Sequence, residues 1–413
     1  MNNEDVQQSD TKIKSQFELV EDQLNKHFEF RYNEISNEVE CLTKKKEQDE
    51  DEPVFKPLNE NNLYRWLKHV HLRFSQADLS ALLRSDFVPT FNPFKYYFES
   101  LLDPPSGIDY IEEFANYVHA TDQVRFNYHF KKMLVRSIAC AIENNVFNKQ
   151  AFILVGYEQN SGKSTFCRFL CPKVLDEYYS EGFSLDKDGQ ISLSENFFIN
   201  LDELAALSKY EINQLKSSFS KDKIKIRRPF EKKATTAPRR ANFLGSTNNA
   251  EFLTDETGSV RWLCFEITGI NWDYKKDINI NNVWAQAYSL YKTGFKYNLT
   301  LADVTENNIV NRKYQVSTPE AEVIAKKYEP GTVSNHDKFL TPFEISKDIN
   351  EENSGVYKFT PVNVGKALIY LGFERTQKRI NGDVNPTRGY YVLIKSTNRL
   401  VTLVTSGTEE LPF

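Results

Sequence analysis

Sulfur-containing side chains are scarce in this sequence, which has five Cys and two Met among its 413 residues. Only Cys167 and Cys171 lie close together, about one helical turn apart. Two thiols without two further ligands favour small apolar packing over a zinc site, which normally has four protein ligands. We therefore expect reduced Cys side chains in a cytoplasmic protein.

Long apolar runs are also missing, since no segment approaches the roughly 18 residues that a membrane-spanning helix needs. The first ten residues, MNNEDVQQSD, are polar and acidic, which predicts no secretory signal. The net charge of −5 excludes binding of nucleic acid through a globally positive field and leaves only local basic patches for that purpose. The 40% hydrophobic and 13% aromatic content is ample for globular cores, and the length indicates two or three domains.

The segment AFILVGYEQNSGKSTFCRFLCP, residues 151–172, has the order strand, loop, helix. This is the context of a phosphate-binding P-loop, whose backbone N–H groups and helix N-terminus hold a β-phosphate. Lys163 would neutralise β- and γ-phosphate oxygens, and the Ser164 hydroxyl would bind Mg²⁺. Five residues, rather than the usual four, separate the two glycines of the loop. The expected nucleotide-binding residues are Gly156, Asn160, Ser161, Gly162, Lys163, Ser164 and Thr165.

An acidic pair follows 39 residues after Lys163, in the segment ENFFINLDEL, residues 195–204. Residues 197–200 predict a strand core, and carboxylates at the carboxyl end of such a strand face the ligand crevice of an α/β sheet. Asp202 would hold Mg²⁺, and Glu203 would polarise the water that attacks the γ-phosphate. The distance along the chain fits one crossover connection between parallel strands.

A basic stretch lies between residues 221 and 240, with nine basic and two acidic side chains. Phosphate contact is the preferred interpretation, because Lys and Arg that neutralise backbone phosphates dominate nucleic-acid affinity. A solvated hairpin is the alternative. The candidate DNA-contacting residues here are Arg227, Arg228, Lys232, Lys233, Arg239 and Arg240.

The next predicted strand, in NFLGSTNN, ends at Thr247 and Asn248. The Asn248 amide would orient the attacking water near the γ-phosphate. A turn at residues 255–258 then leads to Arg261, which would reach the γ-phosphate of a neighbouring subunit as an arginine finger. A surface ion pair is the alternative for Arg261.

Residues 1–150 carry no catalytic carboxylate–His constellation. Residues 16–28 have the apolar spacing of a short amphipathic helix, residues 28–42 alternate as a hairpin, and residues 44–52 are a charged linker. Residues 59–145 have a helical pattern, which would form either a collar or a packing subdomain. The His side chains of this block are expected to be structural: His69, His71, His119 and His129.

The C-terminal region has the order of a winged helix-turn-helix. Thr341-Pro342 and Thr360-Pro361 each start a helix, and Asn381-Gly382 predicts a hairpin after them. Six basic and two acidic residues lie between 361 and 395, which favours DNA binding through the second helix and the wing. Protein contact is the alternative use of such a module. The candidate DNA-contacting residues are Lys366, Lys378 and Arg379.

Taken together, LVGYEQNSGKSTF, FFINLDEL, the basic stretch, FLGSTNN and FLTDETGSVRW resemble the virulence-associated E (VapE/VirE) domain over residues 90–270. That domain occurs in proteins of plasmids, phages and mobile islands and is related to superfamily 3 helicases. The resemblance implies that Lys163 and Ser164 belong to motif A, Asp202 and Glu203 to motif B, and Asn248 to the sensor position. Arg261 matches the family's basic residue after the D-x-T-G turn.

These observations predict an α/β protein with a P-loop NTPase core of the AAA+ or superfamily 3 helicase type, a helical N-terminal region and a C-terminal winged helix. The expected division of the chain is an N-terminal segment and linker (1–52), a helical domain (53–145), the ATPase core (146–295), the winged helix (310–398) and a tail (399–413).

The expected function is that of an ATP-dependent DNA helicase or translocase of a mobile genetic element. Its cofactors would be ATP and Mg²⁺. Its partners would be single-stranded or forked DNA, further copies of the chain in a hexameric ring, and a separate primase or replication protein. It would be cytoplasmic, with no membrane partner. An ATP-switched DNA-binding or assembly protein that does not unwind DNA is the alternative, and a P-loop kinase is a third.

Overall fold

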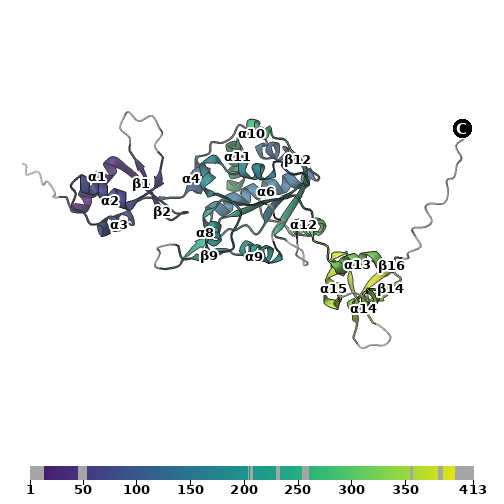
Figure 1. Ribbon diagram of the computed structural model, residues 1–413. Helices are drawn as coiled ribbons and strands as arrows, with labels where there is room; N and C mark the ends of the chain where they lie inside the picture. The colour runs from purple at the N-terminus through teal and green to yellow at the C-terminus, as the bar shows by residue number, and fades with distance from the viewer. Residues whose placement is uncertain are drawn as a thin grey trace, which may run out of the picture.

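The structure is a computed structural model that describes residues 14–44, 54–202, 204, 208–228, 233–253, 260–353, 357–379 and 385–395. Figure 1 shows three bodies along the chain: an N-terminal one in purple, a large central one, and a C-terminal one in yellow. Several predicted features lie outside the described residues: most of the charged linker, Glu203, Lys232, the turn at residues 255–258, the Asn381-Gly382 turn and the tail.

The N-terminal body is a four-stranded sheet packed with three helices. Helix α1 (Gln16–His27) and the antiparallel strands β1 (Phe28–Asn33) and β2 (Glu38–Thr43) match the helix and hairpin expected from the sequence. The remaining elements are β3 (Lys56–Pro57), α2 (Glu60–His69), α3 (Gln76–Leu83) and β4 (Thr90–Phe91), and the strand order is β3-β2-β1-β4. Val20, Leu24 and Leu67 are among the residues of its own hydrophobic cluster.

Three further helices of the expected helical block pack with the central body. They are α4 (Pro93–Ser100), α5 (Tyr110–Ala115) and α6 (Gln123–Ile142), with β5 (Val118–Ala120) between the last two. Phe98, Phe114 and Phe130 from these helices share one hydrophobic cluster with Phe152 and Phe265 of the central strands. The helical pattern is thus present, but packing continues across the predicted boundary at residue 145, because the aromatic face of this block covers the central sheet.

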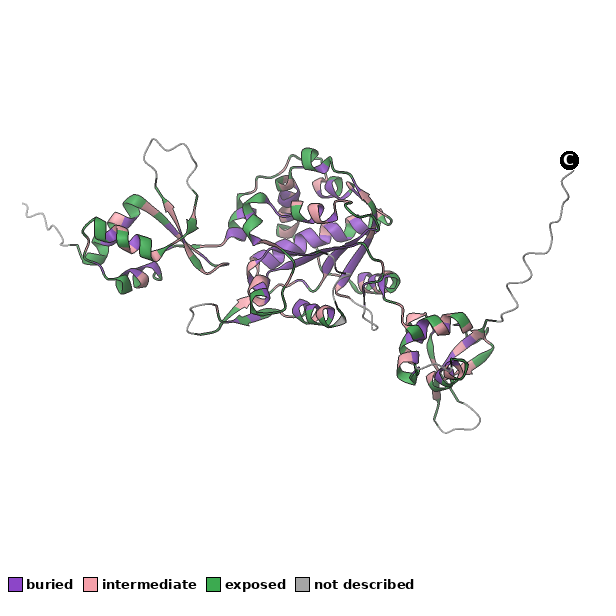
Figure 2. Ribbon diagram, in the orientation of Figure 1, coloured by how far each residue is buried: buried purple, intermediate pink, exposed green. Residues whose placement is uncertain are grey.

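The central sheet has the strand order β5-β12-β6-β11-β8-β7. Strand β5 pairs antiparallel with β12, and the other neighbours in this order pair parallel. The strands are β6 (Ala151–Val155), β7 (Tyr179–Glu181), β8 (Phe198–Leu201), β11 (Asn242–Thr247) and β12 (Trp262–Ile270). Because successive side chains point to opposite faces, Phe152 and Leu154 enter one hydrophobic cluster and Ile153 and Val155 enter the other. Figure 2 shows the sheet and α6 as the buried centre of this body.

Helices cover both faces of the sheet, so the central body is a mixed α/β layer structure. They are α7 (Lys163–Phe169), η1 (Lys173–Tyr178), α8 (Lys187–Glu195), α9 (Lys209–Phe219), α10 (Tyr274–Asp277), α11 (Ile280–Lys292), α12 (Leu301–Asn311) and η3 (Arg312–Tyr314). Sequence analysis did not predict α12. Its signal was a capping box, in which Thr300 and Asp303 each accept from the other's backbone amide.

A two-stranded antiparallel ribbon leaves the central body between α9 and β11. It consists of β9 (Lys223–Ile226) and β10 (Thr235–Pro238). The strand predicted in NFLGSTNN is β11 (Asn242–Thr247), so the second strand of the ribbon, β10, was not predicted. The buried Ile224 and Ile226 attach the ribbon to the hydrophobic cluster beneath it.

The C-terminal body has its own hydrophobic cluster, which includes Ile345, Leu368 and Val392. Its helices α14 (Pro342–Glu352) and α15 (Pro361–Tyr370) begin at the predicted caps Thr341 and Thr360. Strand β15 (Arg375–Lys378) pairs antiparallel with β16 (Thr387–Ile394) as expected. Helix α13 (Pro319–Lys327) and the short strands β13 (Tyr328–Pro330) and β14 (Lys338–Leu340) complete this body.

Within the part of the chain that the structure describes, no helix has both the length and the apolar character needed to cross a membrane. All five Cys are free thiols, and four of them are buried.

Candidate functional site: a polar cavity at the carboxyl ends of three parallel strands

The loop between β6 and α7 makes a tight return that two left-handed residues allow. Asn160 has a φ of 56° and Gly162 a φ of 86°, the latter directly before the first helical residue. Glycine is suited to Gly162 because a β-carbon there would be strained by this φ and would also lie 2.7 Å from the nearest atom of the Trp272 ring. The longer spacing between the two glycines is therefore compatible with a strand–loop–helix unit.

Lys163 is almost fully buried and turned back into its own loop. Its Nζ donates to the carbonyls of Gly156 and Glu158, both at 3.0 Å, and to Ser161 Oγ at 2.9 Å. A further contact of 2.6 Å joins it to Oδ1 of Asn248, at the end of β11. Burial lowers the pKa of Lys163, while the nearby Asp202 carboxylate opposes that effect. The cation is thus held by neutral oxygens that phosphate oxygens would readily replace.

Asp202 lies at the end of β8 and accepts hydrogen bonds from two hydroxyls. Ser164 Oγ, at the start of α7, lies 3.0 Å from both carboxylate oxygens. Ser246 Oγ, from β11, donates to Oδ1 of the same carboxylate. The two Ser oxygens are 3.4 Å apart, so three neighbouring strands bring one carboxylate and two hydroxyls to a single point.

This oxygen cluster has the chemistry of a Mg²⁺ site that is completed by substrate. Mg²⁺ prefers hard oxygen ligands and is commonly held by one or two carboxylates together with waters and the phosphates of a nucleotide. Among the described residues, no group of three or more His, Cys, Asp or Glu could hold a metal ion. Asp202 and the two hydroxyls are hard oxygen donors, so they fit a Mg²⁺ ion for which Asp202 and Ser164 would be the protein ligands.

A cavity of about 820 Å³ joins these groups. Its volume falls within the usual range for small-molecule sites. It extends from Asp202 and Asn248 on one side, across the loop, to Trp272 on the other. Its lining residues are Gln159, Asn160, Ser161, Gly162, Lys163, Ser164, Thr165, Asp202, Ser246, Thr247, Asn248, Asn249 and Trp272.

Two expected site residues lie outside this cavity. Gly156 lines a smaller neighbouring pocket of about 230 Å³, although its carbonyl contacts Lys163. Arg261 lies at the amino end of β12, where its carbonyl accepts from the amide of Ala151, so it is one strand length from the cavity. Its guanidinium donates to Ser220 Oγ at 3.1 and 3.3 Å, which differs from the surface ion pair considered as its alternative role.

Sequence reasoning missed Ser246 and Trp272. Ser246 had a usable signal, because the two-residue period of a strand puts it on the same face as Asn248. Trp272 had none, since it follows β12 and reaches the cavity only through the pairing of β12 with β6.

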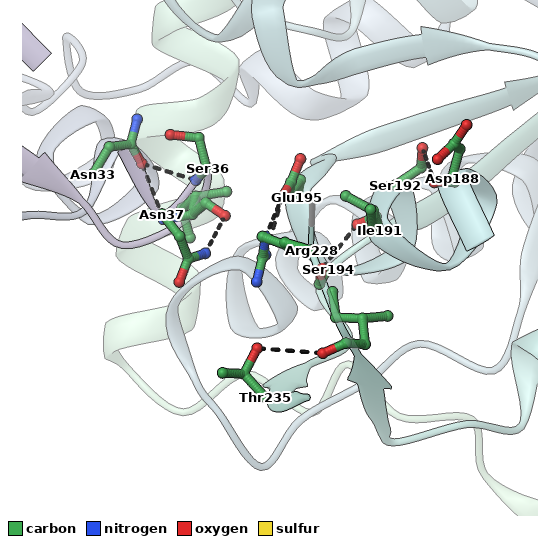
Figure 3. Close-up of polar contacts among 12 residues, drawn as sticks. Asn33, Ser36, Asn37, Asp188, Ile191, Ser192, Ser194, Glu195, Arg228 and Thr235 are labelled. Carbon is green, nitrogen blue, oxygen red and sulfur yellow. Dashed lines mark hydrogen bonds and ion pairs between the residues drawn. The ribbon is translucent and has the colours of Figure 1, made fainter. Parts of the chain in front are cut away.

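The basic ribbon presents a different set of cations from the one expected. Arg228 pairs with Glu195 at 3.0 Å, as Figure 3 shows. In the same view Thr235 bonds across the ribbon, its hydroxyl 3.5 Å from the carbonyl of Ile226. Arg227 and Lys233 are exposed, as are Lys223 and Lys225, which alternate with the buried residues of β9.

Arg239 and Arg240 correct the sequence interpretation, because both are buried. Arg239 donates to the carbonyl of Asn148, and burial lowers its pKa to about 10. Arg240 donates to the carbonyl of Ala141 and to Oδ1 of Asn144, both at 2.7 Å. These side chains bind the end of α6 and the loop after it, so their guanidinium groups are not available to a DNA backbone.

The three candidate residues of the C-terminal body are all at its surface. Lys366 lies on α15, and Lys378 and Arg379 lie at the end of β15. The Lys378 ammonium is 5.8 Å from the ring centroids of both Phe339 and Tyr391, which places the cation over the aromatic side of the sheet. These cations are exposed, as a DNA contact requires.

Comparison with known protein families identifies one family that this chain matches. The model of the virulence-associated protein E-like domain matches residues 102–316, which is more than half of the chain. The protein belongs to the virulence-associated protein E-like family. Comparison with curated proteins finds no match.

A solved structure has a similar fold, and a second form of the same region gives a lower score. The apo structure of the NrS-1 C-terminal region matches with a TM-score of 0.50 and 14% identity, and the alignment covers 92% of this chain and 99% of that one. The A-form apo structure of the same region matches with a TM-score of 0.48 and 13% identity, over 92% and 99% of the two chains. The family match contains every residue that lines the 820 Å³ cavity.

Proposed function

We propose that this virulence-associated protein E-like protein is an ATP-dependent DNA helicase or translocase of a mobile genetic element. The observation that carries the proposal is the cavity itself. Lys163 comes from the loop after β6, Asn248 and Ser246 from β11, and Asp202 from β8. A buried cation, an amide and a carboxylate with two hydroxyls, all at the carboxyl ends of adjacent parallel strands, suit a nucleoside triphosphate with its Mg²⁺.

Each group would act on a different part of the nucleotide. Lys163 would exchange its carbonyl partners for β- and γ-phosphate oxygens, and Ser164 and Asp202 would hold the Mg²⁺ that neutralises developing charge. Asn248 already contacts the Lys163 ammonium, so it lies beside the expected γ-phosphate and would orient the attacking water. Glu203 follows Asp202 in sequence, and we assign it the role of polarising that water.

The position of Arg261 supports hydrolysis between subunits of a ring. Strand β6 separates the two places, and its five residues span about 17 Å, so Arg261 cannot serve the cavity of its own chain. A finger that acts in a neighbouring subunit needs such a remote, surface position. We therefore infer a hexameric ring, with Arg261 contributed by the next copy.

DNA contact is assigned to the exposed basic residues of the ribbon and to the C-terminal body, which we propose is a winged helix. Lys223, Lys225 and Arg227 recur at every second position along β9 and its continuation, so they share one solvent face. A row of cations on one face suits the backbone of a single strand. ATP-driven movement of this ribbon would pull DNA through the ring.

ATP hydrolysis with and without single-stranded DNA tests the proposal, with wild type and Glu203→Gln measured in parallel. We expect hydrolysis that DNA stimulates in wild type and that is lost in Glu203→Gln. A strand-displacement assay on forked DNA then separates the two functions that the site supports. Hydrolysis without DNA stimulation or unwinding would replace the helicase with an ATP-switched DNA-binding or assembly protein.

A further inference from the structure

One side chain that lines the cavity, that of Trp272, has no role in the proposed ATP hydrolysis. Trp272 follows β12 and is the one aromatic residue among the described residues that line the cavity. Its side chain is 45% exposed, whereas Trp262 and Trp284 are fully buried. An exposed indole in an otherwise polar cavity needs an explanation, because large apolar surface at a site usually marks contact with a ligand.

Rigid neighbours hold Trp272 in place. The amide of Asn271 donates to the carbonyl of Tyr117 at 2.8 Å, which fixes the backbone directly before it. Two residues after it, Tyr274 is fully buried against Phe166 and Phe169 of α7, with ring centroids 5.6 and 4.9 Å apart. The indole is therefore positioned by the same helix that begins at Lys163.

The indole lies with its face toward the phosphate-binding loop. A β-carbon built on Gly162 would be 2.7, 3.0 and 3.1 Å from three consecutive atoms of the ring. Such similar distances indicate an approach to the face of the ring, since an approach to its edge would leave the two outer atoms much farther away. The Lys275 ammonium also lies over the ring, 4.4 Å from its centroid. Lys275 is exposed, so it can move when a ligand arrives.

The sheet order defines the direction in which a nucleotide would lie. Asp202 and Asn248 follow β8 and β11, on one side of β6, and Trp272 follows β12, on the other side. The γ-phosphate and Mg²⁺ belong beside Asp202, so the nucleoside end must extend across the loop toward Trp272. Aromatic rings are the usual stacking partners of bases, because every base has a π-face.

We propose that Trp272 is the platform on which the base of the bound nucleoside triphosphate stacks, on the ring face turned away from Gly162, because Gly162 covers the other face. This assignment rests on the proposed function and adds to it the part of the site that distinguishes a nucleotide from inorganic polyphosphate. It also gives the chain a purine preference, since a larger ring covers more of the exposed indole.

The binding of two ligands distinguishes base stacking on Trp272 from a merely structural role of that side chain. Mg²⁺–ADP has a base, and Mg²⁺–tripolyphosphate has only the phosphates. Titration calorimetry on the full chain is expected to show that Trp272→Ala weakens ADP binding about tenfold, within the range for one base–aromatic stack, and changes tripolyphosphate binding less than about twofold. Trp272→Phe keeps a ring and should retain most of the ADP affinity.

Fluorescence gives a second readout, because the chain has four Trp. ADP is expected to change the emission of wild type and of the control Trp66→Phe, whose side chain lies in the N-terminal body, but not that of Trp272→Phe. Tripolyphosphate should leave the emission of all three proteins unchanged.

The outcomes are distinct. An equal loss of affinity for ADP and for tripolyphosphate in Trp272→Ala would show that the indole only supports Gly162, and it would overturn the proposal. Unchanged affinity for ADP in that variant would also overturn it. Lys163→Ala must lose both ligands if the cavity binds phosphates at all. Failure of wild type to bind either ligand would refute the proposed function, and the stacking assignment with it.

Discussion

Two substitutions that each remove one positive charge should have opposite effects on DNA binding and on stability. Lys225→Gln neutralises an exposed residue of β9, whereas Arg240→Gln neutralises a buried one 15 positions later. Sequence composition treats the two as members of one basic stretch. The two differ in the structure, because the Arg240 guanidinium donates hydrogen bonds to the end of α6 and the loop after it.

The expected magnitudes follow from these contacts. Arg240 makes two charged hydrogen bonds of 2.7 Å inside the protein, and each such bond contributes about 1.5–3 kcal/mol. The Gln amide would replace these hydrogen bonds only in part. We therefore expect a loss of about 3 kcal/mol in the free energy of unfolding and a fall of roughly 6–12 °C in the melting temperature of the central body. Lys225→Gln should cost at most about 0.5 kcal/mol, as surface substitutions do.

The assay is binding of fluorescent single-stranded DNA across a salt series, alongside thermal unfolding of each variant. Loss of one phosphate contact reduces the slope of log affinity against log salt by about 0.7 on single strands. Lys225→Gln should reduce the slope and leave the melting temperature unchanged. Arg240→Gln should lower the melting temperature and leave the slope unchanged. A stable Arg240→Gln protein with a reduced salt slope would refute the assignment of Arg240 to the core. An unchanged slope in Lys225→Gln would show that β9 is not part of the DNA interface.

Three further variants test the site and its support. Ser246→Ala removes one hydroxyl from Asp202 and should raise the Mg²⁺ concentration for half-maximal hydrolysis about fivefold, while calorimetric affinity for metal-free ADP stays constant. Gly162→Ala combines a φ of 86° with no room for a methyl group, so phosphate binding should fall at least tenfold with little loss of the core's stability in denaturant titrations. Burial opposes ionisation of Asp303, but hydrogen bonds from Lys132 and the Thr300 amide lower its pKa to about 2. Its carboxylate therefore stabilises the fold above about pH 4 and loses that effect between about pH 4 and pH 2. Asp303→Asn should lower the free energy of unfolding by about 3 kcal/mol at pH 7, and the difference from wild type should narrow over that acid range in urea titrations.

The sequence predicted the local parts of the site because they depend on local patterns. A run of apolar residues ending at Val155 and the Gly-Lys-Ser segment after it are sufficient to place Lys163 at the start of the helix that follows the strand. The same reasoning placed Asp202 and Asn248, since each follows a short apolar strand. Parallel pairing then brings such strand ends together without any further information from the sequence.

The burial of Arg239 and Arg240 could not be predicted, because their partners are distant in sequence. Ala141 lies 99 residues before Arg240, and Asn148 lies 91 residues before Arg239. Composition alone favours the surface for charged side chains, and only the packing of α6 against the strands reverses that preference. The same long-range packing explains why the helical pattern before residue 145 was recognised but its attachment to the sheet was not.

The arrangement of β11 indicates how the cavity would communicate with DNA. At its carboxyl end, Asn248 contacts Lys163 and Ser246 contacts Asp202, so both halves of the proposed phosphate site meet on this strand. At its amino end, β11 starts four residues after β10 of the basic ribbon. A shift of Asn248 on nucleotide binding would act along a fully buried strand, which transmits displacement better than a surface loop. Asn248→Ala should lower hydrolysis without DNA, because Asn248 is proposed to orient the attacking water, and should also abolish the fold increase that DNA gives. DNA affinity without nucleotide should stay unchanged. Full stimulation in that variant would show that coupling takes another route.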